Sequence, residues 1–177
     1  MGTKETCLKT IDFPALRIVS PRIQYPGDIA FRVQDRFVEY KSEQKDGMMV
    51  QVQVRYLSDE WKASFANLEV PTTTACDLEM HELILDLYGK QITDGIGGSI
   101  ETNPAIMWWM IENDHLLKGK TYYFYMVDEN HILREVCVTW GGYWGFFPSY
   151  LKYPGRNAGG GYVVCRKRRK PKERPAN

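Results

Sequence analysis

The sequence lacks the features that would assign it to several large classes of protein. None of its apolar runs approaches the roughly 18–20 residues that a membrane-spanning helix needs. Its N-terminus has no apolar signal region, and the chain contains no Asn-x-Ser/Thr glycosylation site. We therefore expect a protein without a transmembrane segment, located in the cytoplasm or the nucleus.

Close pairs of metal-binding residues are also absent. Four cysteines lie far apart in the sequence, at Cys7, Cys76, Cys137 and Cys165. The histidines form no His-x-x-x-His pair and stand at His81, His115 and His131. Zinc fingers and ribbons need close pairs, because one turn of the chain presents two ligands to the metal. The pattern predicts free thiols, and histidines that lie at the surface or cap a helix. It predicts no cofactor and no bound metal.

No sequence motif assigns a catalytic residue. The glycine-rich segment 95–99 lacks the lysine of a phosphate-binding loop. The segment 156–161 is followed by a strand pattern instead of the helix that a pyrophosphate loop requires. A site combining His131, Cys137 and a carboxylate stays open, since such groups assemble in space, but nothing in the sequence places them together.

What the sequence does have is a strongly basic C-terminus. Residues 166–177 hold seven basic residues and one acidic residue, whereas the rest of the chain holds 16 basic and 21 acidic ones. The basic residues are Arg166, Lys167, Arg168, Arg169, Lys170, Lys172 and Arg174. This asymmetry favours a polyanionic partner, either nucleic acid of unknown type or another anionic assembly. The same charges would suit a nuclear import signal, an anionic membrane surface or a solubilising terminus.

A dense aromatic stretch precedes the basic segment. Residues 140–153 hold seven aromatic side chains interleaved with three glycines. Most of these rings are expected in the core, because aromatic side chains bury large apolar areas. Four are candidates for exposed rings that stack on nucleic-acid bases: Tyr143, Trp144, Tyr150 and Tyr153. Lys152 and Arg156 would add positive charge beside them.

Length and composition indicate one folded domain. With 177 residues, 44% hydrophobic and 13% aromatic, the chain is large enough to form a packed core. We place this domain at residues 1–165 and the polybasic tail at residues 166–177.

Alternation of apolar and polar residues predicts several β-strands. One predicted hairpin joins residues 29–40 to residues 48–57, and a second joins residues 122–127 to residues 132–140. Residues 122–125 are aromatic on both faces, which predicts a central strand covered on both sides. Residues 161–166 are predicted to form a last strand.

Two segments show helical patterns. Residues 74–88 begin with a capping-box pattern and have apolar residues at helical spacing. Residues 103–117 begin with Asn103 and Pro104, a favourable start for a helix, and are apolar almost all round. The resulting prediction is an α+β fold: a mostly antiparallel β-sheet with two α-helices packed on it and a disordered basic C-terminal tail.

Three functional hypotheses follow from these patterns. The first is a non-enzymatic protein that binds the backbone of RNA or DNA through its basic arm, as a ribonucleoprotein component or a virus-like structural protein. The second is a small-molecule-binding domain or an enzyme, with an aromatic-lined pocket beside Trp108 and Trp109. The third is a protein-interaction scaffold subunit that uses the apolar second helix.

Overall fold

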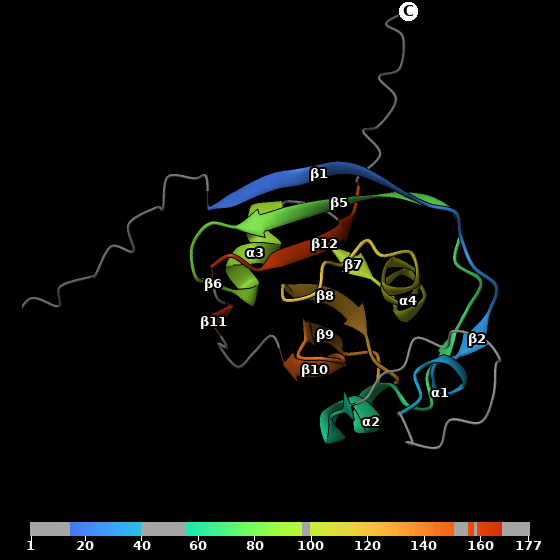
Figure 1. Ribbon diagram of the computed structural model, residues 1–177. Coiled ribbons are helices and arrows are strands. Elements are labelled where there is room, and N and C mark those ends of the chain that lie inside the picture. Colours follow the sequence, from blue (N-terminus) through green and yellow to red (C-terminus); the bar gives the residue numbers. More distant parts are fainter. Residues whose placement is uncertain (1–14, 40–55, 97–99, 151–155, 158, 168–177) are drawn as a thin grey trace, which may run out of the picture.

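A large, mostly antiparallel β-sheet organises the fold (Figure 1). The computed structural model describes residues 15–39, 56–96, 100–150, 156–157 and 159–167. The sheet has the strand order β1-β5-β12-β8-β9-β10-β3, and β7 pairs with β8. Its strands are β1 (Leu16–Tyr25), β3 (Tyr56–Leu57), β5 (Cys76–Leu83), β7 (Glu101–Thr102), β8 (Thr121–Val127), β9 (Leu133–Trp140), β10 (Trp144–Tyr150) and β12 (Tyr162–Arg166).

Two small pairs of strands complete the β-structure of the described residues. Strand β2 (Phe31–Arg32) pairs with β4 (Glu69–Val70), and β6 (Leu87–Tyr88) pairs with β11 (Arg156–Asn157). The parallel pairs of the main sheet are β12–β8, β7–β8 and β10–β3. The prediction of a mixed fold with a mostly antiparallel sheet is therefore confirmed.

The part of the chain that the structure describes contains four helices, where the sequence predicted two. They are α1 (Val33–Arg36), α2 (Asp59–Phe65), α3 (Gly89–Ile96) and α4 (Pro104–Glu112). No helix among these residues has the length and apolarity to cross a membrane.

Helix α4 starts where the sequence predicted it. Asn103 Oδ1 accepts a hydrogen bond of 3.0 Å from Ile106 N, and Pro104 occupies the first helical turn. The helix is apolar because it belongs to the core: most of its residues are buried, among them Ile106 and Met110. Most of its apolar surface is thus covered by other parts of this chain.

The central hairpin is confirmed in position and register. Strands β8 and β9 pair antiparallel along their full length, from Thr121 opposite Thr139 to Val127 opposite Leu133. The five middle residues of β8 are all buried, as the aromatic pattern on both faces predicted. The last predicted strand is β12, which lies between β5 and β8.

The predicted helix over residues 74–88 is wrong, since residues 76–83 form strand β5. This strand is hydrogen-bonded to β1 on one edge and to β12 on the other. Leu78 and Met80 face one core cluster and Leu83 faces a second. Cys76, Leu78 and Met80 alternate with polar residues as in a strand, but Leu83, Ile84 and Leu87 follow Met80 at a spacing that also fits a helix.

The predicted hairpin of residues 29–40 and 48–57 is also corrected. Residues 31–36 form the short strand β2 followed by helix α1, and β3 pairs with β10 instead of with residues 29–40. Residues 48–55 lie outside the described part of the chain. Strand β10 was not foreseen: it follows β9 through a turn in which Gly142 has φ +88° and Gly141 N donates to Tyr143 O.

Candidate functional site

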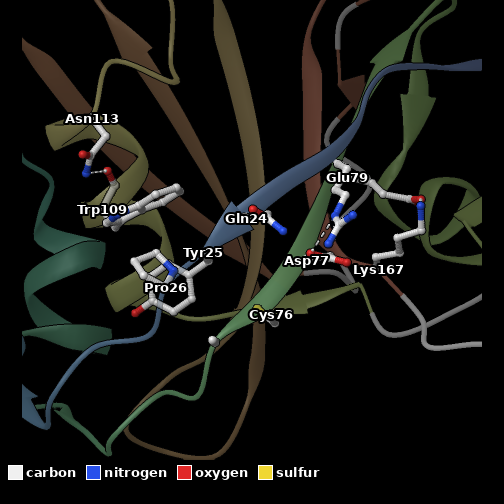
Figure 2. A pocket seen from close by; sticks show the side chains of 11 residues that line it. Gln24, Tyr25, Pro26, Cys76, Asp77, Glu79, Trp109, Asn113 and Lys167 are labelled. Atoms are coloured by element: carbon white, nitrogen blue, oxygen red, sulfur yellow. Dashed lines mark hydrogen bonds and ion pairs between the residues drawn. The ribbon is translucent and has the colours of Figure 1, made fainter.

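A wide groove of about 1170 Å³ lies at one end of the β1–β5 pair (Figure 2). Side chains from the end of β1, the start of β5, the end of α4 and Lys167 line it. The groove thus brings together four segments that are far apart in the sequence. Figure 2 shows Tyr25 and Trp109 on one side of the groove and Asp77, Glu79 and Lys167 on the other.

Two aromatic rings form the apolar side of the groove. The rings of Tyr25 and Trp109 meet edge to face with centroids 5.4 Å apart. Trp109 is half-buried and also packs against His115, with ring centroids 4.6 Å apart. Asn113 ends α4 and its side-chain amide donates a hydrogen bond of 2.9 Å to Trp109 O. This side therefore presents a partly exposed indole next to a polar amide.

Paired charges form the opposite side. Arg22 Nε lies 3.2 Å from Asp77 Oδ1, and Lys167 Nζ lies 3.2 Å from Glu79 Oε1. Each basic side chain in the wall of the groove thus has an acidic partner.

The first two basic residues of the C-terminal segment belong to the sheet. Arg166 ends β12 opposite Leu78, and its buried Nε makes no hydrogen bond. Lys167 N donates a hydrogen bond of 2.8 Å to Asp77 O, which fixes the backbone beside the groove. Residues 168–177, including five of the predicted phosphate contacts, lie outside the described residues.

The other predicted basic contacts are placed only in part. Arg156 lies in β11 opposite Tyr88, and only its backbone is described. Lys152 and Tyr153 fall outside the described residues.

The predicted exposure of Trp144 is wrong. Trp144 is only 6% exposed and its ring packs against Trp140, because β10 turns this side chain toward the larger core cluster. Tyr143 is half-buried. Tyr150 is exposed, but the Arg134 guanidinium covers its ring at 3.5 Å. The described part of the aromatic stretch therefore forms no open platform for bases.

The two tryptophans of the predicted pocket have different environments. Trp108 is buried in the core, where its ring lies 4.9 Å from that of Phe37. Trp109 lines the groove. The sequence could place both on one helix, but the packing of α4 decides which ring faces outward.

A second cluster lies on the neighbouring part of β5 and β12. One potential ligand atom from each of Glu79, His81 and Cys165 lies within 4.8 Å of the other two. His81 is 8% exposed, in contrast to the surface position that the sequence suggested. Burial and the nearby Glu79 raise the pKa of the Cys165 thiol to about 12, so the thiol is protonated at neutral pH. The sequence did not reveal this cluster, because strand pairing brings together residues more than 80 positions apart.

Comparison with protein-family models, with curated proteins and with solved structures finds no match to this chain. The fold alone therefore gives its structural class, that of a mixed α/β protein with a mostly antiparallel sheet. The features of this chain that bear on function are the groove, the basic segment and the cluster on β5 and β12.

Proposed function

We propose that this is a non-enzymatic, nucleic-acid-associated protein that binds phosphates through its C-terminal basic segment. The observation that carries the proposal is the start of that segment: Lys167 lines the groove and is fixed by the backbone of Asp77. Five more basic residues follow within the next seven positions. The basic segment therefore begins beside the groove.

The charge pattern favours binding to phosphates. Each lysine or arginine that neutralises a phosphate releases condensed counterions, so the affinity of such a segment falls steeply with salt. The groove itself contributes little net charge, because Arg22 and Lys167 are paired with carboxylates. The phosphate contacts are therefore assigned to residues 168–174 and not to the walls of the groove.

The groove favours a single-stranded partner over a duplex. Single-strand binders place aromatic rings for base stacking next to positive charge that follows the backbone. Trp109 provides a partly exposed ring, and Gln24 and Asn113 provide polar groups for base edges. In this arrangement one or two bases occupy the groove while the basic segment follows the adjoining phosphates.

The double variant Arg168→Ala/Arg169→Ala tests the phosphate contacts. In this variant the slope of log affinity against log salt concentration should become shallower by roughly two units, because two phosphate contacts are removed. Fluorescence anisotropy with a labelled single-stranded oligonucleotide across a salt series measures this slope. The matched control is Arg32→Ala/Lys90→Ala, which removes two exposed charges elsewhere and should leave the slope unchanged. An unchanged slope in the first variant rules out these phosphate contacts.

A further inference from the structure

The cluster of Glu79, His81 and Cys165 has the geometry of a metal-binding site. Glu79 and His81 are two residues apart on β5, so their side chains project from the same face of the sheet. Cys165 lies directly opposite Glu79 in the antiparallel β5–β12 pair, and its side chain shares that face. The potential ligand atoms all lie within 4.8 Å of one another.

One ring nitrogen of His81, Nε2, lacks the hydrogen bond that a buried imidazole nitrogen normally makes. Its Nε2 is buried and makes no hydrogen bond, although Glu79 Oε2 lies 3.4 Å away. Leaving such a group unsatisfied costs about 1–3 kcal/mol. Ligation of a cation by Nε2 would supply the missing partner.

Glu79 is held in place by a neighbour outside the cluster. Lys167 Nζ lies 3.2 Å from Glu79 Oε1, whereas Oε2 is directed toward His81. The ion pair thus occupies one carboxylate oxygen and leaves the other for the cluster. Hydrogen bonds and ion pairs that orient ligands in this way are typical of metal sites in proteins.

We propose that Glu79, His81 and Cys165 bind one zinc ion, with the fourth coordination position open. Sulfur and imidazole nitrogen favour zinc over magnesium and calcium, which prefer oxygen ligands alone. The carboxylate and the thiolate balance the double positive charge of the ion. Three protein ligands with one open position are typical of zinc sites that bind water or an external ligand.

Zinc binding requires the thiolate form of Cys165. The ion therefore displaces the thiol proton, which is released to solvent. The ion reaches the site past Glu79, which lines the groove and whose side chain is 19% exposed. Cys165 itself is 1% exposed, which favours a metal ligand over a nucleophile that attacks a substrate.

Cobalt(II) is the probe for this site, since it takes tetrahedral zinc positions and absorbs light. Full-length protein treated with a chelator and then titrated with Co²⁺ should show one thiolate-to-metal charge-transfer band, saturating at one ion per chain. Zn²⁺ should then abolish the band by displacement. A folded protein that gives no band, or a band that Zn²⁺ does not displace, overturns the proposal.

Variants assign the ligands. Cys165→Ser should lose the band, and His81→Gln should weaken Co²⁺ binding by more than about a hundredfold. The matched control is Cys137→Ser, which removes a half-buried thiol on β9 outside the cluster and should keep the band. A band that persists in Cys165→Ser but disappears in Cys137→Ser places the metal elsewhere and overturns the assignment.

Thermal unfolding provides a second measurement, and a cooperative transition also shows that each variant is folded. At a hundredfold excess over its dissociation constant, Zn²⁺ should raise the Tm of the wild-type chain by about 5–10 °C. His81→Gln and Glu79→Gln should each unfold cooperatively and show little of this rise. Equal rises in the wild type and in both variants contradict the site.

Discussion

Replacing Asp128 with alanine is expected to lower the free energy of unfolding by about 3–5 kcal/mol, because it breaks a buried ion pair. Asp128 Oδ2 accepts a hydrogen bond of 2.7 Å from Arg134 Nε, and both side chains are almost fully buried. Asp128 Oδ1 accepts hydrogen bonds from the backbone N–H groups of Asn130 and Ile132. One carboxylate therefore neutralises a buried guanidinium and shapes the β8–β9 turn.

Urea denaturation measures this loss. The matched control is Asp94→Ala, which breaks an exposed ion pair of similar length with Lys90. The control should lose no more than about 0.5 kcal/mol, since solvent screens exposed pairs. Equal losses in the two variants would contradict the role assigned to burial.

The same pair should make stability depend on acid pH. Burial alone would raise the pKa of Asp128, but hydrogen bonds from Ile132 N, Arg134 and Asn130 N outweigh it and hold the pKa below its ordinary value. The stabilisation by the charged Asp128 carboxylate is therefore fully present above the pKa of about 3.9 that an aspartate has in the unfolded chain. It is lost as the pH falls through the lower folded pKa, so the stability gap between the wild type and Asp128→Asn should narrow below about pH 4.

Replacing Trp61 with alanine is expected to lower the free energy of unfolding by about 3–5 kcal/mol. Trp61 is fully buried, and its ring stacks on Phe65 with centroids 4.7 Å apart. It also contacts the rings of Phe37 and Phe146, at 5.2 Å each, so it joins α2 to the sheet. Its removal leaves a cavity between α2 and β10 that the surrounding core cannot fully fill.

Urea denaturation of Trp109→Ala provides the comparison. This variant removes the same side chain from a half-buried position facing the groove, so its loss should be clearly smaller. If the groove variant loses as much stability as Trp61→Ala, Trp109 is a core residue and not a binding residue.

The sequence predicted those parts of the fold in which local signals agree with the packing. The β8–β9 hairpin combines strand-forming residues with a polar turn, and α4 begins with Asn103 as a side-chain cap. The prediction failed at β5 because Leu83, Ile84 and Leu87 continue the apolar positions from Met80 at helical spacing, which obscured the alternation of Cys76, Leu78 and Met80. In such a segment the pairing with β1 and β12 decides the structure, and a single sequence does not show that pairing.

The candidate sites were predictable only where charge alone defines them. The basic segment is visible because seven basic residues are adjacent in the sequence. The groove and the β5–β12 cluster depend on strand register: Cys165 meets Glu79 only because those two strands pair. The helix predicted for residues 74–88 would have placed His81 on a solvated face, which is why its burial was missed.

Binding of labelled single-stranded RNA, single-stranded DNA and duplex DNA across a salt series tests the proposed function most directly. The full-length protein is compared with a full-length variant in which the five basic residues of segment 168–174 are replaced by glutamine. A matched control replaces five exposed basic residues elsewhere, namely Arg17, Arg32, Lys62, Lys90 and Lys118.

The wild type and the control should bind with steep salt dependence and prefer single strands. In the variant with glutamines in segment 168–174, the slope of log affinity against log salt concentration should be shallower by about 3.5–4.5 units. Absence of binding by the full-length protein at low salt, or equal slopes for all three proteins, would contradict the assignment of nucleic-acid binding to the basic segment.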